Sequence, residues 1–349
     1  MNLKCNRRKC IISSYGANTH QGTVRNYNED RVSIILNMMK PKNKQNEPYW
    51  PTCSFFGIYD GHGGQNCAEF LRDQLHYFII QDEYFPKDPQ KAIMRGFEKA
   101  EDAWTEKAEN SPVFDKAGSC AIVVMLIDNM CYSINLGDSR AVLSEQGGKI
   151  VTDLSTDHKP SEPGEEKRIT NLGGKIYQSQ IPIVVNNKTG AQQIIKGPFR
   201  VLPGRLAVSR TIGDSEAKLP KYGGIKNVVS AEPDIMKFEI KDTHDFIFLG
   251  CDGIFDKMTN QEVINYMWEI APNHKSPHEF VGKSIERIMQ LSMMKKSFDN
   301  VTCVVVGFKN LENILANQIQ GLVNTNFNSN NNKNNNRNIN NGNSTNFRQ

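Results

Sequence analysis

Acidic residues stand at the ends of several short apolar segments in this sequence. The positions are Glu29 with Asp30, Asp60, Asp138, Asp252 with Asp256, and Asp299. Because their apolar segments must pack in one core, the ends of these segments could converge on one rim of the fold. Carboxylates brought together in this way repel one another and must be neutralised, which a bound cation can do.

The chemistry of the candidate ligands indicates which cation. Carboxylate and backbone carbonyl oxygens are hard ligands, which favour Mg²⁺ or Mn²⁺ over Zn²⁺ or copper. Ca²⁺ accepts the same ligands, although the sequence contains no EF-hand loop. The acids outnumber the ligands that one octahedral ion needs, so we expect two ions that share a bridging aspartate. Such a pair is suited to an in-line displacement at phosphorus.

Each of these features has a structural explanation when it is taken alone. An Asp-Gly pair after a strand, as at Asp60 and Asp252, is most often a turn. His62 could be a structural histidine, Arg25 could be a surface charge, and Glu29 could belong to a solvated loop. Their joint occurrence in one chain is what favours a catalytic site.

The segments that must position these residues show strand and helix patterns in turn. Short runs rich in β-branched and aromatic residues predict strands at 53–59, 120–127, 130–135, 139–145, 245–251 and 301–308. Apolar residues at helical spacing predict helices at 65–80, 89–109, 161–174, 261–269 and 277–294. In the third of these helices, Ser161 is the expected N-cap and a Gly-Gly pair the expected stop. Strands in series, one pair joined by a hairpin at 128–129, indicate an α+β fold with antiparallel sheets.

Composition divides the 349-residue chain into a globular body and two unusual ends. Removing the four basic residues of 1–10 and the three of 324–349 changes the formal net charge from +4 to −3, which argues against nucleic acid as a partner. Asparagine makes up 14 of the 26 residues from 324 onward, a composition that cannot build a core. We predict a flexible basic N-terminus (1–12), a catalytic domain (13–310), a short helix or linker (311–323) and a disordered Asn-rich tail (324–349).

Cysteine usage and hydropathy predict where the protein works. The eight cysteines are scattered without a CxxC pair, which is typical of reduced thiols in an intracellular protein. The N-terminus lacks the apolar core of a signal peptide, and no apolar run is long enough to span a membrane. We expect a cytoplasmic or nuclear monomer, with weak membrane contact conceivable only through the basic CNRRKC segment at 5–10.

The chemistry-bearing segments also resemble those of a known family, the metal-dependent serine/threonine protein phosphatases of type 2C. The similar motifs run in order through most of the chain: RNYNED (25–30), YDGHGG (59–64), GSCAIV (118–123), NLGDSRAVL (135–143), DHKP (157–160), EEKRITNLGG (165–174), GRLAVSRTIGD (204–214), AEPDI (231–235), CDGIFD (251–256) and DNVT (299–302). Each motif is weak alone, whereas all ten in one order are specific.

The resemblance implies a sandwich of two antiparallel sheets flanked by helices, with a dinuclear Mg²⁺ or Mn²⁺ site at one edge. It implies that Asp60 bridges two ions, that the Gly61 carbonyl binds one, and that Asp252 and Asp299 complete the other. Metal-bound waters or a third, weaker ion would be held by Glu29, Asp30, Asp138 and Asp256. Arg25 would hold the substrate phosphate and His62 would be the general acid. A hydroxide bridging the ions would then hydrolyse phosphoserine or phosphothreonine in proteins.

Two segments depart from the family pattern. Cys120 stands where the family usually has threonine, and 175–200 is a long segment in the place of a flap beside the active site. We expect a hairpin turn at the Asn-Asn-Lys-Thr-Gly of 186–190, and a contact of Arg200 with phosphopeptide. Two alternatives to a protein phosphatase stay open: an inactive scaffold of the same family, and a hydrolase of small phosphorylated molecules.

Overall fold

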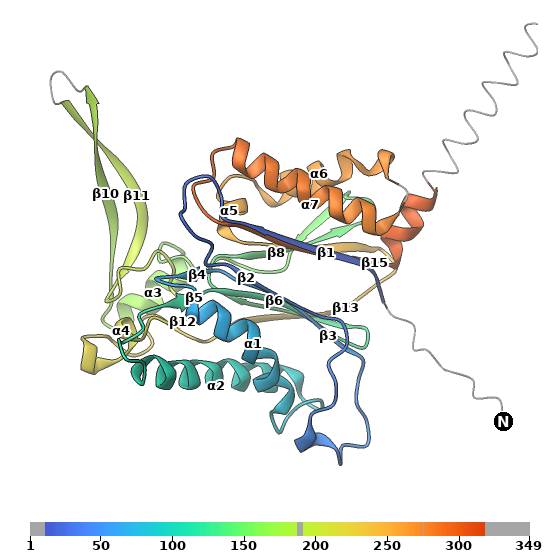
Figure 1. The fold of residues 1–349 in the computed structure, drawn as a ribbon, viewed down its shortest axis with the longest axis horizontal. Coiled ribbons are helices and arrows are strands. Elements are labelled where there is room, and N and C mark those ends of the chain that lie inside the picture. The colour runs from blue at the N-terminus through green and yellow to red at the C-terminus, as the bar shows by residue number, and fades with distance from the viewer. Residues whose placement is uncertain (1–10, 187–190, 275, 318–349) are drawn as a thin grey trace, which may run out of the picture.

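Two five-stranded antiparallel sheets pack face to face in the computed structural model, which describes residues 11–186, 191–274 and 276–317 (Figure 1). The first sheet has the order β1 (Ile12–His20), β15 (Val301–Phe308), β14 (His244–Gly250), β8 (Arg140–Glu145) and β9 (Ile150–Asp153). The second has the order β13 (Asp234–Glu239), β7 (Met130–Leu136), β6 (Ala121–Ile127), β3 (Cys53–Tyr59) and β2 (Arg31–Ile35). The predicted α+β fold with a central antiparallel sandwich is confirmed.

Strand β3 shows why the central strands are apolar without interruption. Its alternate residues Phe56 and Ile58 pack between the two sheets. The intervening residues Phe55 and Tyr59 pack on the opposite face, in a separate core beneath the helices. A strand that is covered on both faces needs apolar residues at every position, because successive side chains point to opposite faces. All seven residues of β3 are accordingly buried.

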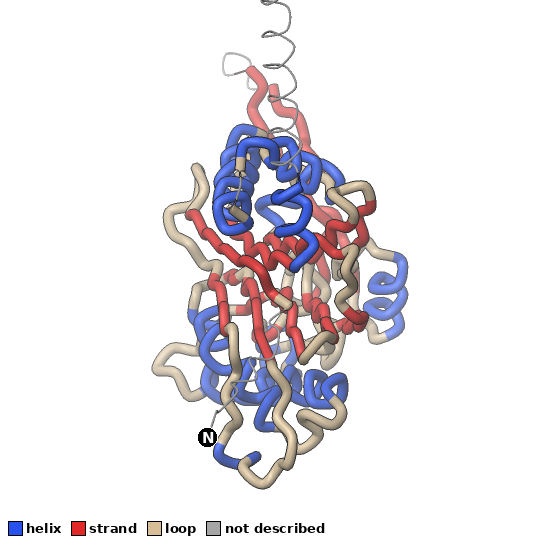
Figure 2. Tube along the Cα trace, turned by 90° about the vertical axis from the view of Figure 1, so that its right-hand side faces the viewer, coloured by secondary structure: helices blue, strands red, loops and turns tan. Residues whose placement is uncertain are grey.

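Helices cover the outer face of each sheet and complete four layers (Figures 1 and 2). Helices α1 (Asn66–Gln81) and α2 (Pro89–Glu109) lie on the second sheet, and α6 (Asn260–Glu269) and α7 (Pro277–Met294) lie on the first. The stripe predicted for α2 is buried, with Trp104 1% exposed. These helices therefore bury the outer faces of the two sheets.

Smaller elements lie around the two main sheets. They are the three-stranded sheet of β12 (Ile212–Gly213), β5 (Gly118–Ser119) and β4 (Gly61–His62), the short helices α3 (Pro163–Asn171), α4 (Ser215–Lys218) and α5 (Asp252–Phe255), and the 3₁₀ turns η1 (Lys42–Lys44), η2 (Pro220–Tyr222) and η3 (Ala271–Asn273). The predicted flap is a hairpin of β10 (Lys175–Asn186) and β11 (Ala191–Leu202), which projects from the body in Figure 1. Its predicted turn falls largely on 187–190, which lie outside the described residues.

One detail of the helix prediction is wrong. The helix expected at 161–174 begins at Pro163, with Glu162 in place of Ser161 as the N-cap residue, and no side chain caps it. The φ of proline is fixed near the helical value, and proline has no backbone N–H for a cap to satisfy. A helix can therefore begin at Pro163 without a side-chain cap. The Gly-Gly stop is confirmed, because Gly173 has a φ of +86° after the last turn.

The two ends of the chain are described only in part. Residues 309–317 are helical, and Leu311 and Leu315 pack against the core beside α7. Residues 1–10 of the predicted basic N-terminus (1–12) and the Asn-rich tail from 324 lie outside the described residues. The six cysteines that the structure describes are all buried and free. Among the described residues, no helix is both long and apolar enough to cross a bilayer.

Candidate functional site

Nine of the ten predicted site residues line one cavity of about 620 Å³ at an end of the sandwich. They are Arg25, Glu29, Asp60, Gly61, His62, Asp138, Asp252, Asp256 and Asp299. The tenth, Asp30, is 2% exposed and interacts electrostatically with Asp299 and Glu29 of the cavity lining. These residues come from five separate places in the chain, so the predicted convergence of strand ends occurs.

The backbone explains how each acid reaches the cavity. Asp60 follows β3, and Asp252 starts α5 just after β14. Asp299 precedes β15, and Asp138 lies in the turn between β7 and β8. Because β3 lies in one sheet whereas β14 and β15 lie in the other, packing the two sheets brings the acids together across the edge of the sandwich.

The carboxylates of Asp60 and Asp252 lie close to each other. One oxygen of each lies within 4.8 Å of the other and of the Cys251 sulfur. Desolvation raises the pKa of Asp60 well above its ordinary range, and the charge of Asp252 raises it further. The pKa of Asp252 is raised in the same way, first by desolvation and then by the charges of Asp138 and Asp299. Each negative charge is therefore destabilised by its neighbours.

Two further acids strengthen this effect. Burial raises the pKa of Asp30 to about 6, although the nearby polar side chains of Thr302 and Cys251 act to lower it. Burial also raises the pKa of Asp138 to about 6, against the charge of Lys159. The Asp30 Oδ2 atom is buried without a hydrogen-bond partner. Crowded carboxylates with an unpartnered buried oxygen are a donor set that fits a hard divalent cation such as Mg²⁺ or Mn²⁺.

Cys251 lies beside these acids but is unsuited to bind a hard cation. Its sulfur donates to the Asn300 carbonyl (3.4 Å) and accepts from the Thr302 amide (3.2 Å). Burial, and then the charges of the neighbouring acids, raise the pKa of the thiol well above its ordinary range. A neutral thiol is a poor metal ligand, so Cys251 serves as packing beneath the acids.

Arg25 and Glu29 come from the loop between β1 and β2. Arg25 Nη2 donates to Asp299 Oδ2 at 2.7 Å, and the arginine side chain is 48% exposed. Glu29 Oε1 accepts from the Gly64 amide at 2.6 Å. The guanidinium thus stands at the open side of the cavity, beside an acid of the cluster.

His62 is held by an acid that is not among the residues predicted from the sequence. His62 Nε2 lies 2.8 Å from Asp214 Oδ2, and Asp214 is the N-cap residue of α4. Burial lowers the pKa of His62, but the charge and hydrogen bond of Asp214 outweigh burial and raise it overall. Asp214 follows Gly213 at the end of β12, so the strand-end pattern that identified the other acids applies to it as well.

Lys159 lines the cavity and was not among the predicted site residues. Its ammonium lies 3.2 Å from Asp256, 3.3 Å from Asp157 and 3.9 Å from Asp138. It is the one lysine among the described residues that line the cavity. Its place in the DHKP motif was the only signal in the sequence that could have identified it.

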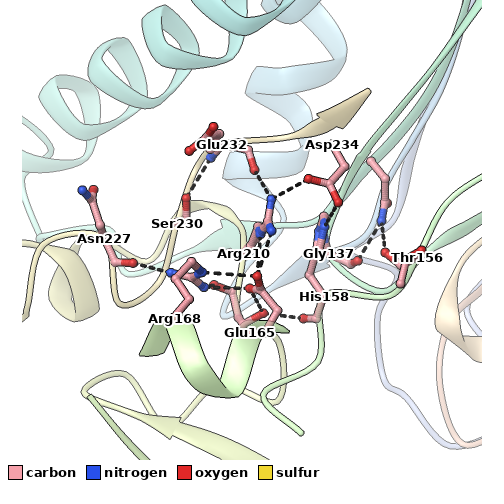
Figure 3. A network of polar contacts seen from close by, with 12 residues as sticks. Gly137, Thr156, His158, Glu165, Arg168, Arg210, Asn227, Ser230, Glu232 and Asp234 are labelled. Atoms are coloured by element: carbon pink, nitrogen blue, oxygen red, sulfur yellow. Dashed lines mark hydrogen bonds and ion pairs between the residues drawn. The ribbon is translucent and has the colours of Figure 1, made fainter. Parts of the chain in front are cut away.

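A buried network of charges supports the loop that carries Lys159 (Figure 3). Glu165 accepts from Arg168 (2.7 Å), Arg210 (2.8 Å) and Ser209 Oγ (2.5 Å). The Ser209 amide donates to the carbonyl of His158 (2.8 Å), and the Ser209 hydroxyl oxygen lies 2.9 Å from the same carbonyl. The network therefore fixes the backbone of the residue that immediately precedes Lys159.

His158 connects this network to the residues next to the cavity. Its Nδ1 accepts from the Gly137 amide (3.0 Å), and its own amide donates to the Gly137 carbonyl (2.9 Å). An Nδ1 that accepts carries no proton, so Nε2 is the nitrogen that donates to Asp234 (3.1 Å). Gly137 precedes Asp138, and the network thus positions both Asp138 and Lys159.

Residues of the two segments that depart from the family pattern also line the cavity. The Cys120 thiol donates to Asp138 Oδ1 at 3.7 Å. Pro198, Phe199 and Arg200 at the base of the β10–β11 hairpin line the cavity too. Arg200 Nη1 donates to the Arg205 carbonyl at 2.7 Å. The hairpin base therefore borders the same cavity as the acids.

Known proteins share both the sequence pattern and the fold. The family model described as protein phosphatase 2C matches residues 18–301. Two similar relatives come from Arabidopsis thaliana. Probable protein phosphatase 2C 27 is 31% identical over 73% of this chain and 59% of the relative. Probable protein phosphatase 2C 69 is 34% identical over 76% of this chain and 64% of the relative. The chain thus spans about three fifths of the length of these relatives.

Solved structures agree in fold. A Caenorhabditis elegans sex determining protein has a TM-score of 0.67 at 20% identity, covering 86% of this chain and 66% of its own. A phosphatase from Toxoplasma gondii has a TM-score of 0.63 at 21% identity, covering 85% of this chain and 92% of its own. The match of the family model to most of the chain shows that this protein belongs to the protein phosphatase 2C family.

Proposed function

We propose that this protein is a Mg²⁺- or Mn²⁺-dependent phosphatase that hydrolyses phosphoserine and phosphothreonine in proteins. The observation that carries the proposal is the crowding of Asp60 and Asp252 with further acids around one cavity that Arg25 and His62 also line. Membership of the protein phosphatase 2C family supports the same activity.

The acids would divide the metal binding between them. Asp60 would be shared by two ions, the Gly61 carbonyl would bind one of them, and Asp252 and Asp299 would bind the other. Water ligands or a third, weaker ion would be held by Glu29, Asp30, Asp138 and Asp256. Bound ions of this kind supply a hydroxide nucleophile near neutral pH and neutralise charge on the phosphoryl oxygens.

Arg25 and His62 would act on the substrate itself. The planar guanidinium of Arg25 can donate two parallel hydrogen bonds to phosphoryl oxygens, and its exposed position leaves it accessible to a substrate. His62 would give its proton to the departing serine or threonine oxygen, which leaves poorly as an alkoxide. Asp214 would orient the imidazole and favour its protonated form.

The β10–β11 hairpin would contact the protein that carries the phosphate. Phe199 is 42% exposed and lines the cavity together with Arg200. An exposed aromatic and a guanidinium beside the cavity could bind the peptide around the phosphorylated residue, which a small phosphorylated molecule lacks. Phosphoproteins are thus the proposed partners, while a monomeric state and a cytoplasmic or nuclear location stay predictions from the sequence.

Phosphate release from a phosphothreonine peptide tests the proposal. Wild-type protein should release phosphate with Mg²⁺ or Mn²⁺, and the release should stop when EDTA is added. Asp60→Ala should abolish the reaction, whereas Asp73→Ala, at an exposed ion pair with Arg72 on α1, should retain it. Folded wild-type protein that is inactive with both metals would favour an inactive scaffold. Release from small phosphorylated molecules alone would contradict the proposed substrate class.

A further inference from the structure

Asn300 binds the loop between β1 and β2 through its side chain. It is 4% exposed, and its Nδ2 donates to the carbonyls of Gln21 (2.8 Å) and Tyr27 (3.0 Å). Its Oδ1 accepts from the Glu29 amide at 2.9 Å. The amide group of an asparagine offers two donors and an acceptor oxygen, and here all three interactions are made with the backbone of one loop.

The backbone of Asn300 is bonded to the acid cluster. Its amide donates to Asp299 Oδ1 at 2.8 Å, and its carbonyl accepts from the Cys251 thiol. Gly253, the residue after Asp252, packs so closely on this carbonyl that a Cβ would overlap it. One residue therefore connects the β1–β2 loop to the strand ends that carry Asp252 and Asp299.

The loop has little apolar packing of its own to fix its position. Val24 is 57% exposed and Tyr27 is 60% exposed, so neither anchors it in the core. Other bonds are scattered, such as those from Arg31 Nη1 to the Asn28 carbonyl (2.9 Å) and from Thr23 Oγ1 to the Ser297 carbonyl (3.5 Å). Among the described contacts, the Asn300 side chain provides the largest group of hydrogen bonds from one residue to this loop.

We propose that Asn300 is a positioning residue that locks the β1–β2 loop, and with it Arg25 and Glu29, in register with the metal-binding acids. It touches neither the reacting phosphate nor the ligand oxygens of Asp60 and Asp252. Its loss should therefore act mainly on the binding of phosphate by Arg25. The effect on catalysis rests on the proposed phosphatase function, whereas the locking of the loop does not.

Hydrogen exchange tests the locking without any need for activity. In metal-free Asn300→Ala, the backbone amides of 21–29 should exchange at least about tenfold faster than in wild type, since the bond to the Glu29 amide and the two bonds to loop carbonyls are lost. The amides of β3 should be unchanged. Asn310→Ala is the matched control, because Asn310 Nδ2 also donates twice, to Asp245 (2.7 Å) and to the Thr243 carbonyl, far along the chain from the loop. Unchanged exchange at 21–29 in folded Asn300→Ala would overturn the proposal.

Steady-state kinetics test the consequence for substrate binding. Asn300→Ala should raise KM for a phosphopeptide and weaken inhibition by inorganic phosphate, each by about tenfold, with a smaller change in kcat. If Asn300→Ala does not fold, Asn300→Asp replaces both donors by an oxygen that repels the Gln21 and Tyr27 carbonyls, and should show the same split. If the wild-type protein has no phosphatase activity but exchange at 21–29 is faster in Asn300→Ala, the proposed function is refuted and the locking of the loop stands. A fall in kcat with unchanged KM and unchanged phosphate inhibition would overturn the positioning role.

Discussion

Replacing Glu165 by glutamine removes the charge at the centre of the network in Figure 3. The Glu165 side chain is 7% exposed, and its carboxylate receives hydrogen bonds from Arg168, Arg210 and Ser209 at 2.5 to 3.2 Å. A glutamine keeps one acceptor oxygen and turns an NH₂ group toward donors. Among the described residues, Arg168 is then left partly buried without a counter-charge, and Arg210 keeps only the carboxylate of Asp234 as an ionic partner.

The magnitude follows from the loss of one partner of a buried ion pair, which costs about 3–5 kcal/mol. This is a large share of the roughly 5–15 kcal/mol that stabilises a typical domain. Desolvation raises the pKa of Glu165, but the hydrogen bonds from Arg168, Arg210 and Ser209 outweigh it and hold the pKa far below its ordinary 4.5. Because the pKa is lowered on folding, the stabilisation is complete above pH 4.5 and declines as the pH falls below that value.

Urea unfolding followed by tryptophan fluorescence measures this difference. At pH 7 the free energy of unfolding of Glu165→Gln should be about 3–5 kcal/mol lower than that of wild type. At pH 4 the difference should be smaller by about 1 kcal/mol. Glu286→Gln, at the exposed pair with Lys283 on α7, should change little. A Glu165→Gln protein within about 1 kcal/mol of wild type at pH 7, or a difference that grows toward pH 4, would refute the reasoning.

Three further outcomes test other parts of the structure. Trp104→Ala, which empties a site that is 1% exposed beneath the second sheet, should lower the free energy of unfolding by about 3–5 kcal/mol in urea titrations. Gly253→Ala should lower the free energy of unfolding, because its Cβ would overlap the backbone carbonyl of Asn300 just before β15. Gly282→Ala, which has open space around it in helix α7, should instead raise the free energy of unfolding by about 0.5–1 kcal/mol. Equal effects of the two substitutions would contradict this. Arg200→Ala should raise KM for a phosphopeptide but not for p-nitrophenyl phosphate, and Lys196→Ala, on the same hairpin but outside the cavity lining, should change neither.

The central strands could be predicted from the sequence because they are buried on both faces. The strands expected at 53–59 and 301–308 are β3 and β15 with the same bounds, and every residue in both is buried. β1 and β13 were not predicted, since each stands at the edge of its sheet and carries many exposed residues. An edge strand with a solvated face lacks the apolar run on which the prediction depended.

The site could be predicted where one local pattern marks it, and not where tertiary packing alone creates it. Acids at strand ends identified Asp60 and Asp252, and the structure brings them into one cavity. The pairing of His62 with Asp214 joins residues 152 positions apart, and no spacing rule reaches that far. The hydrogen bonds of Asn300 depend likewise on where a loop 271 or more positions away folds back.

Calorimetric titration with Mn²⁺ tests most directly the claim that the crowded acids form a dinuclear metal site. Wild-type protein should bind two equivalents, and folded Asp60→Asn, which lacks the shared carboxylate, should lose binding of at least one. Asp73→Asn, at the exposed pair with Arg72, should bind as wild type does. Wild-type protein that binds no Mn²⁺, or Asp60→Asn that binds two equivalents with unchanged affinity, would contradict the account.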